Sequence, residues 1–536
     1  MKRVCVVASI GVFGFFGSIA AAAWPADPTV NLPVAVKPGD QAVQKIATMP
    51  DGTTWIGWFD NSAGSYQVFV QRLDPSGVAT FAPGGLLVSA NPQSTSLVDW
   101  DLTVDGAGNC FLAFTETRDG GDLDTLAYLI SPSGTFLWGA NGVQVSSTNS
   151  DFEADPRVLF TQSGEYLVVW PRFTTPGLYL QRISAGGAIE LPVGGVKIAG
   201  DGPEAPAFVE MVGTPDGGFI AMWQRDTRVF SSPRHLRAMK FNSSGAAQWG
   251  SVVEVSNGNS MSIASRQKLI ADGSGGAAMG WHDGRTGGTR AYVQRVNSAG
   301  AIQFAAGGTQ CSTAAGLLDF DPAIAFIPGT GDLMAFFDQR NGSQSLRGLF
   351  VQKFDSAGVR QFGNVGKELL PVDGAHEGLQ RAVSSTGGAT VLYMSTPNAG
   401  IGDSSSELRA MRVDANGDEV WAGSPIAMST PAVSKFRLNI TADAGGQIRA
   451  CWQDGRNDQS DIYAQNINPD GSLGVAPVSC PGDANGDLMI DAADLSVLLS
   501  NFGQPAAGPG FGDFNGDGVC NGADLSVLLA VFGSSC

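Results

Sequence analysis

Short apolar runs, separated by turns rich in Gly, Asp, Asn and Ser, recur along most of the chain. A turn of the form D/N/S-x-x-G follows such a run in eight segments, and successive turn glycines are 53 to 59 residues apart. These glycines are Gly77, Gly134, Gly187, Gly245, Gly300, Gly358, Gly417 and Gly471. Eight copies at one spacing predict a tandem repeat.

The pattern of residues within each repeat predicts four short antiparallel strands. The first ends in a Gly-rich turn, the second ends in an aromatic residue, the third follows a variable polar loop, and the fourth follows the D/N/S-x-x-G turn. The aromatic residues are Trp58, Phe114, Trp170, Trp223, Trp281, Phe336, Tyr393 and Trp452. One such sheet cannot bury both of its faces, so neighbouring repeats must pack together.

These features predict a mainly β chain with an eight-bladed β-propeller over residues 41–476. A seven-bladed ring and two smaller propellers are the alternatives. Within residues 24–40, the segment Asn31–Val36 resembles a fourth strand, and we expect it to complete the last blade and close the ring. The variable loops fall at one end of every blade, which is where we expect a ligand site.

Charge and the N-terminal segment narrow the class of protein. The net charge of −18 argues against nucleic acid as a partner. Residues 1–23 have a basic head, an apolar run and an Ala-rich end, which is typical of a cleaved signal peptide; an uncleaved anchor is the alternative. No later apolar run is long enough to span a membrane, so we expect a mature chain that is secreted or held at the cell surface.

Residues 477–536 contain two similar acidic loops, 483–494 and 513–524, each followed by the same DLSVLL sequence. Ca²⁺ prefers six to eight oxygen ligands, which a twelve-residue loop supplies from positions 1, 3, 5, 7, 9 and 12. We therefore predict two bound Ca²⁺ ions. The predicted ligands are Asp483, Asn485, Asp487, the Met489 carbonyl, Asp491 and Asp494, and then Asp513, Asn515, Asp517, the Val519 carbonyl, Asn521 and Asp524.

Two loop–helix copies with Asp at position 12 resemble a type I dockerin domain. The resemblance implies a small α-helical domain that binds a cohesin-like module or a cell-surface scaffold. The residues at the recognition positions are Ala492, Ala493, Gly522 and Ala523. They are small, the helices lack the basic residues typical of dockerins, and Leu488 replaces the usual Gly at position 6, so the identity of the partner stays open.

Cysteines and histidines suggest no catalytic or zinc chemistry. Six cysteines follow the predicted signal peptide, with no C-x-x-C pair, and the chain has three His. We predict a disulfide between Cys480 and Cys536. Cys520 is expected to be buried, reduced and opposite Ile490.

Three repeats carry D-x-R after the second strand: Asp283 with Arg285, Asp338 with Arg340, and Asp454 with Arg456. A ring of ligand-binding groups is one interpretation, and turn capping with Asp–Arg pairing is the favoured one, because a single ligand site rarely needs one pair in several blades. The segment Pro50–Trp55 also resembles a sialidase Asp box, which is a turn motif. No residue is assigned a catalytic role.

The sequence thus favours an exported calcium-binding protein whose dockerin-like tail tethers a non-catalytic propeller. The alternative is a dockerin-anchored glycoside hydrolase or other polysaccharide-degrading enzyme with its site on the variable-loop end, which requires two close carboxylates. The seventh repeat is the least regular and is the first place to look for them. A purely structural coat role is a third possibility.

Overall fold

The computed structural model describes residues 23–93, 99–118, 123–146, 151–200, 205–226, 234–257, 261, 265, 267–396, 405–475, 482–485, 489–504, 512–514 and 519–534. The chain divides into two compact units, residues 1–475 and 476–536. The predicted signal peptide lies outside the described residues, except for Ala23. No helix in the described ranges is both long enough and apolar enough to cross a membrane.

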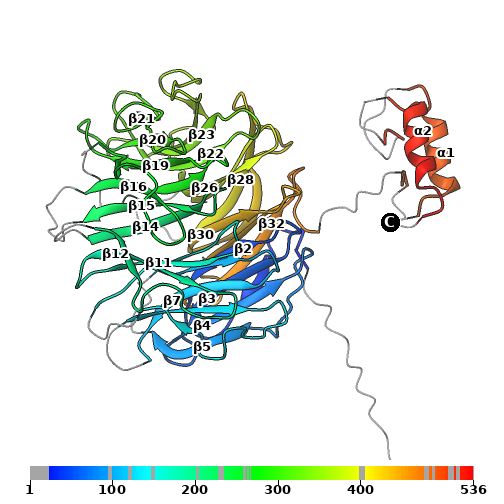
Figure 1. The fold of residues 1–536 in the computed structure, drawn as a ribbon. Helices are drawn as coiled ribbons and strands as arrows, with labels where there is room; N and C mark the ends of the chain where they lie inside the picture. Colours follow the sequence, from blue (N-terminus) through cyan, green and yellow to red (C-terminus); the bar gives the residue numbers. More distant parts are fainter. Residues whose placement is uncertain are drawn as a thin grey trace, which may run out of the picture. The chain divides into compact units, whose positions relative to one another are not determined.

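The first unit is an eight-bladed β-propeller, as predicted (Figure 1). Eight four-stranded antiparallel sheets form the blades, and the first strands of neighbouring blades pack around the centre. These innermost strands are β2 (Gln41–Thr48), β6 (Asp101–Val104), β10 (Arg157–Phe160), β14 (Ala205–Gly213), β18 (Lys268–Ala271), β22 (Leu317–Phe326), β26 (His376–Ser385) and β30 (Lys435–Ala442).

The second strands carry the most continuously apolar sequence and are almost wholly buried. They are β3 (Thr54–Asp60), β7 (Cys110–Glu116), β11 (Tyr166–Arg172), β15 (Phe219–Asp226), β19 (Ala277–Asp283), β23 (Leu333–Asn341), β27 (Gly388–Thr396) and β31 (Ile448–Asp454). The third strands are β4 (Tyr66–Leu73), β8 (Asp124–Ile130), β12 (Gly177–Ile183), β16 (His235–Phe241), β20 (Arg290–Val296), β24 (Arg347–Phe354), β28 (Ser406–Asp414) and β32 (Asp461–Ile467).

The outermost strands follow the D/N/S-x-x-G turns, and several are only two residues long. They are β5 (Leu86–Gln93), β9 (Val143–Gln144), β13 (Val196–Ala199), β17 (Val253–Glu254), β21 (Thr309–Gln310), β25 (Lys367–Glu368) and β29 (Ile426–Val433), with β1 (Leu32–Ala35) completing the last blade. Short outer edges limit unwanted strand pairing with other chains.

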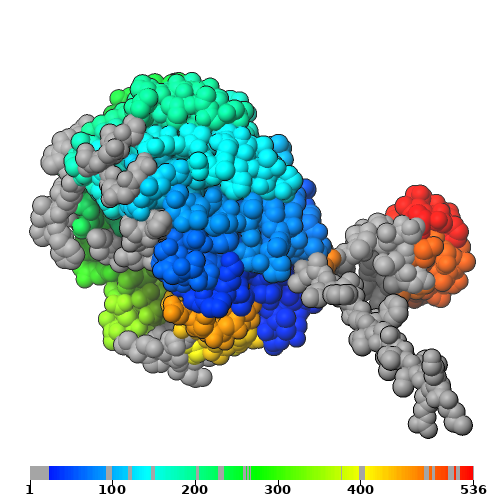
Figure 2. Space-filling view, turned by 90° about the horizontal axis from the view of Figure 1, so that it is seen from below, coloured from blue at the N-terminus to red at the C-terminus, as the bar shows by residue number. Residues whose placement is uncertain are grey.

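The ring closes as the sequence predicted, because β1 pairs antiparallel with β32, with Leu32 opposite Ala464. A hydrogen bond also joins the first blade to the last, because the backbone amide of Gln41 donates to the Ser460 carbonyl at 2.8 Å. The N-terminal strands, in blue, and the last propeller strands, in orange, lie next to each other in both views (Figures 1 and 2).

The repeated turn glycines join neighbouring blades. A Cβ on Gly77 would lie 2.9 Å from the indole of Trp24, and one on Gly300 would lie 2.6 Å from the Trp249 ring. Six other turn glycines have the same role, and seven of the eight face an aromatic ring of the preceding segment. The exception is Gly245, which faces Ile198. Glycine is required here both for close approach and for its positive φ.

Within a blade, the aromatic residue of the second strand stacks on an aromatic residue of the third. Ring centroids are 6.0 Å apart for Trp58 and Phe69, 6.1 Å for Trp170 and Tyr179, and 5.9 Å for Trp281 and Tyr292. A glycine before the outer strand closes the same slot: a Cβ on Gly85, Gly195 or Gly308 would lie 2.5 Å from the indole of its own blade.

The second unit contains two short helices, α1 (Ala492–Ser500) and α2 (Gly522–Ala530). The two helices pack on each other. The buried apolar side chains among the described residues of this unit are Ile490, Leu498, Cys520 and Leu528. Both helices begin two residues before the repeated DLSVLL sequence.

Candidate functional sites in the two units

The two acidic loops end in matching helix caps. Asp491 caps α1 and Asn521 caps α2, and each accepts the backbone N–H two residues further on at 2.7 Å. Asp494 and Asp524, three residues after the caps, accept the cap backbone N–H at 2.8 and 2.9 Å. This reciprocal capping box explains why each helix starts where its loop ends.

The carboxylates at loop position 12 lie fully buried inside their loops. Asp494 Oδ1 accepts from the Ala484 and Asn485 amides at 2.7 and 3.2 Å, and Asp524 Oδ1 accepts from the Phe514 amide at 2.8 Å. Burial raises the pKa of Asp494, but these amide donors lower it by more, so its pKa lies below the usual value. The first loop is therefore wound around an ionised Asp494 carboxylate.

The other predicted ligands are only partly described. Asp483 and Asn485 lie in the first loop, and Met489 and Val519 occupy position 7 of the two loops; Asp513 begins the second loop. The predicted ligands Asp487, Asn515 and Asp517 lie outside the described residues. Within the described ranges, no three His, Cys, Asp or Glu side chains are gathered as a metal site. What fits Ca²⁺ is the pair of buried position-12 carboxylates with the loop backbone wrapped around them.

Cys520 is buried, as expected, and is a free thiol that donates to the Leu498 carbonyl at 3.2 Å. Its side chain shares one buried apolar cluster with Ile490, Leu498 and Leu528. The Cys520 amide donates to Gln504 O at 3.1 Å, and the Ile490 amide donates to Ser534 O at 3.0 Å. Each loop therefore pairs with the segment beyond the other copy's helix. The predicted Cys480–Cys536 disulfide lies outside the described residues.

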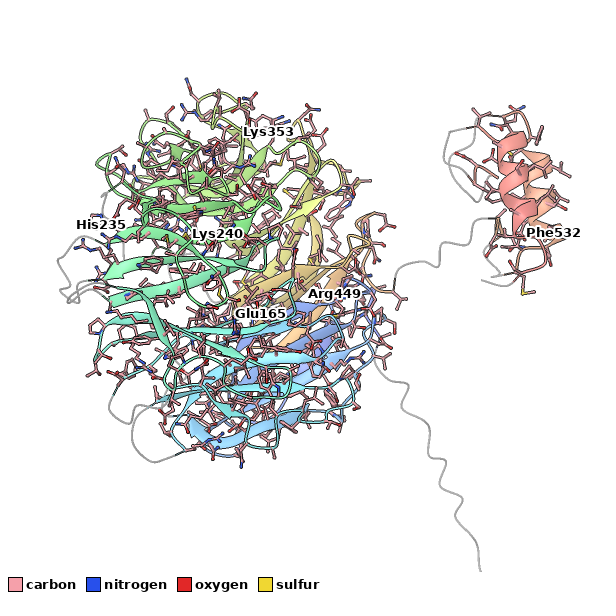
Figure 3. All side chains as sticks on the ribbon, viewed as in Figure 1. Glu165, His235, Lys240, Lys353, Arg449 and Phe532 are labelled. Atoms are coloured by element: carbon pink, nitrogen blue, oxygen red, sulfur yellow. The ribbon has the colours of Figure 1, made fainter. Side chains whose placement is uncertain are left out.

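The predicted partner-contact residues Ala492, Ala493, Gly522 and Ala523 are all exposed on the first turns of the helices. Larger apolar residues are exposed too, at positions that match after a shift of thirty residues. They are Met489, Leu499 and Phe502 in the first copy and Val519, Leu529 and Phe532 in the second, each at least 40% exposed. Figure 3 marks Phe532. Aligning the two copies by sequence would have revealed these pairs.

In the propeller, the D-x-R groups of the fifth and eighth blades are structural. Trp281 Nε1 donates to Asp283 at 3.0 Å, and the Arg285 guanidinium pairs with the same carboxylate while lying 4.1 Å from the centre of the Tyr292 ring. In the eighth blade Arg456 pairs with Asp454 at 2.7 Å and covers Tyr463. Both aspartates also cap the turn that follows.

The sixth blade departs from this pattern. Phe337, not the predicted Phe336, occupies the stacked position, with its ring 6.0 Å from Phe350. Asp338 therefore lies one residue after the stacked ring instead of two. Arg340, paired with Asp338, covers Phe320 of the innermost strand and not a third-strand aromatic residue. The D-x-R equivalence predicted for this blade is wrong by one residue in register.

A group of buried ionisable residues lies where the sixth and seventh blades meet. Burial raises the pKa of Glu377 to about 7, and the Asp373 and Asp338 charges add to this effect. Burial also raises the pKa of Asp338 to about 6, against the opposing charge of Arg340. Glu377 Oε2, Asp338 Oδ1 and Tyr393 Oη have no hydrogen-bond partner, and the three residues are at most 4% exposed. Sequence reasoning singled out the seventh repeat and named Asp338 and Tyr393 for other reasons, but it did not name Glu377.

A second charged network lines the innermost strands. Asp99 pairs with Lys45 at 2.7 Å and with Arg157 at 2.9 Å. Burial raises the pKa of Asp99, but the two cations outweigh it and hold the pKa well below the usual range. Burial raises the pKa of neighbouring Asp101 to about 6. These contacts tie the first three blades together.

A cavity of about 120 Å³ lies at the boundary between the third and fourth blades. Its polar wall is Trp223, Arg225 and Arg237, and its apolar wall includes Ile198, Pro206 and Val252. These residues come from the variable-loop ends of β13, β14, β15 and β16 and from the residue before β17.

No family model and no curated protein matches this chain. Solved structures resemble this chain only in the path of the backbone. The chain is similar to the Dos1 propeller (TM-score 0.46, 10% identity, covering 84% of this chain and 95% of that one) and to an ulvan lyase (TM-score 0.44, 10% identity, covering 85% and 96%). It is also similar to the polysaccharide lyase Uly1 (TM-score 0.43, 10% identity, covering 82% and 91%). Similarity at this level assigns no chemistry to the present chain.

Proposed function

We propose that this chain is an exported protein whose C-terminal unit binds two Ca²⁺ ions and attaches the propeller to a partner, as the resemblance to dockerins implies. The observation that carries the proposal is the matched placement of Asp494 and Asp524. Each is buried, receives loop amides and lies in the first turn of a helix. When bound, Ca²⁺ would supply the positive charge that draws the remaining loop oxygens inward.

Charge supports the same proposal. Between Cys480 and Cys536 there are seven Asp and no Lys, Arg or Glu. Two Ca²⁺ ions offset four of these seven charges. Without them, repulsion opposes the folding of a unit in which four apolar side chains are buried among the residues that the structure describes.

The exposed face of the unit supports attachment to a protein partner. Small residues at the helix starts let another backbone approach closely, and the duplicated apolar residues such as Leu499 and Leu529 offer surface to bury. The partner is a cohesin-like module or another cell-surface scaffold. The propeller is then the attached binding module, and its variable-loop end is the face that meets its ligand.

Calcium titration of the full chain tests this proposal. We expect about two ions to bind, with a gain of helical circular dichroism. Asp494→Asn and Asp524→Asn should each remove one ion, because the amide keeps the size of the side chain but not its charge. Asp470→Asn, on an exposed turn of the propeller, is the control and should leave both ions bound. Binding that these loop variants do not change would contradict the proposal.

A second candidate function is cleavage of a polysaccharide by the propeller, favoured by the neighbouring buried carboxyls of Asp338 and Glu377. One protonated and one ionised carboxyl is the arrangement that glycoside hydrolysis uses. Incubation with neutral and acidic polysaccharides, followed by an assay for new reducing ends, tests it. Activity that Glu377→Gln abolishes would establish an enzyme, whereas activity that this variant leaves unchanged would exclude this pair.

A further inference from the structure

The fourth blade lacks both features that close the slot above the second-strand indole in the first, third and fifth blades. Register identifies the equivalent residues: Trp223 pairs with Arg237, as Trp281 pairs with Tyr292. An arginine thus replaces the stacked aromatic residue. Val253 pairs with Ala238, as Thr309 pairs with Val293, so that Val252 holds the place of Gly308.

The two replacements explain the cavity. In the fifth blade the Gly308 backbone approaches the indole so closely that a Cβ would lie 2.5 Å from it. Val252 has a Cβ and two methyl groups, so the same approach is impossible for β17. The turn at the blade boundary is also less filled, because Gly245 faces Ile198 where the other turns face an aromatic ring. The space that remains is the cavity of about 120 Å³.

The walls of the cavity define a chemical class of ligand. Two guanidinium groups, on Arg225 and Arg237, line it, and no acidic residue is among its lining residues. Arg237 Nε also donates to Glu254 at 2.6 Å, which holds the guanidinium in place. A guanidinium offers five donors in a planar fork that matches a carboxylate. The Trp223 indole and the side chains of Ile198 and Pro206 provide an apolar surface for a small ring.

We propose that this cavity is a binding site for a carboxylate carried on a small ring, the chemistry of a uronic acid residue. A cavity of roughly 150 Å³ encloses a benzene molecule, so the present one of about 120 Å³ admits the carboxylate and the ring edge that carries it, and not a whole sugar. The inference rests on the proposed binding role of the propeller and is independent of the calcium loops.

The cavity lies near the start of the third strand of its blade. Figure 3 marks His235 and Lys240, which lie on either side of Arg237 on β16. The seventh blade offers a matched control. Its third-strand residue at the same register is also an arginine, Arg409, which pairs with Glu407 at 2.6 Å and does not line the cavity.

Titration of the full chain with D-glucuronate, followed by calorimetry and saturation-transfer NMR, tests the proposal. We expect glucuronate to bind, and D-glucose, which lacks the carboxylate, to bind at least about tenfold more weakly. Arg237→Gln should weaken glucuronate binding about tenfold, whereas Arg409→Gln should leave it unchanged. No binding, equal binding of glucose, or equal effects of the two variants would overturn the proposal.

A second ligand and a double variant test the same proposal further. Glutarate carries the carboxylate without the ring, and binding as tight as that of glucuronate would overturn the ring requirement. The double variant Arg237→Tyr with Val252→Gly restores the residues of the fifth blade and should abolish binding at an unchanged melting temperature. Binding retained by this folded variant would place the ligand elsewhere. Calcium titration of the same samples separates failure of this site from failure of the proposed attachment.

Discussion

Neighbouring repeats in the propeller are joined by large rings packed against glycines, whereas the two repeats of the C-terminal unit are joined by a small aliphatic cluster that includes Leu498 and Leu528. In the propeller, each blade is supported on both sides and the ring has no free end. In the C-terminal unit, the charge of the loops opposes the packing. From this difference we propose that the propeller is stable from packing alone, while the C-terminal unit depends on a bound cation.

The largest expected effect lies in the C-terminal unit. Leu498→Ala removes one of four buried apolar side chains and should cost about 2 to 5 kcal/mol, enough to unfold this unit while the propeller stays folded. Hydrogen exchange of the α1 and α2 amides, measured with Ca²⁺ present, checks this. Leu499→Ala is the control, because Leu499 is 57% exposed and its loss should leave exchange unchanged. Equal effects of the two variants would contradict the assigned core.

A smaller but clear effect is expected at the glycines that close the slots of the propeller. Gly308→Ala should cost about 3 kcal/mol, because the new Cβ meets the Trp281 ring and the residue has a φ of +90°. Gly139→Ala has a similar φ of +84° and open space around it. Gly139→Ala should therefore cost only about 1 kcal/mol, which is the cost of placing a Cβ on a left-handed backbone conformation. Thermal unfolding of both variants gives the difference, and equal losses would refute the packing role.

The predicted fold depended on features that repeat eight times. Turn glycines, strand order and the closing strand all recur or complete a recurring unit, so the blade number and ring closure followed from the sequence. The register of the sixth blade did not. Phe336 and Phe337 are both aromatic, and only strand pairing shows that Phe337 is the stacked residue.

The candidate sites were predictable to different degrees. One helix after each loop and the burial of Cys520 followed from the duplicated loops, while exposure of Phe502 and Phe532 required the folded unit. The cavity beside Trp223 was hidden because Arg237 and Val252 acquire meaning only when register aligns them with Tyr292 and Gly308. The Glu377 group was hidden because burial, not sequence, sets its pKa.

An effect of pH is expected in the propeller and tests whether the buried carboxyl at Glu377 is a local weakness in otherwise stable packing. Because the pKa of Glu377 is raised to about 7 in the folded chain, ionisation opposes folding above that pH. Stability should rise as pH falls from 8 to 5, by about 1 to 3 kcal/mol. Glu377→Gln should be more stable than the parent at pH 8 and nearly equal to it at pH 5.

Melting temperatures at the two pH values check this expectation. Glu368→Gln, on the exposed outer strand β25, is the control and should keep the pH dependence of the parent. If Glu377→Gln melted below the parent at pH 8, Glu377 would be stabilising as an anion, and its assigned environment would be wrong.

The smallest effect is expected for the arginines that stack on third-strand rings. Arg456→Lys keeps the charge beside Asp454 but loses the planar contact with Tyr463, whose centre lies 3.9 Å away. Thermal unfolding should show a loss of about 1 kcal/mol. No loss would indicate that the ion pair alone matters.

Differential scanning calorimetry of the full chain, with Ca²⁺ and then with excess chelator, tests the central claim most directly. The account predicts two transitions with Ca²⁺, of which chelation removes only the smaller one, belonging to residues 476–536. The larger propeller transition should keep its temperature and enthalpy. An unchanged small transition after chelation, or a loss of the propeller transition, would contradict the account.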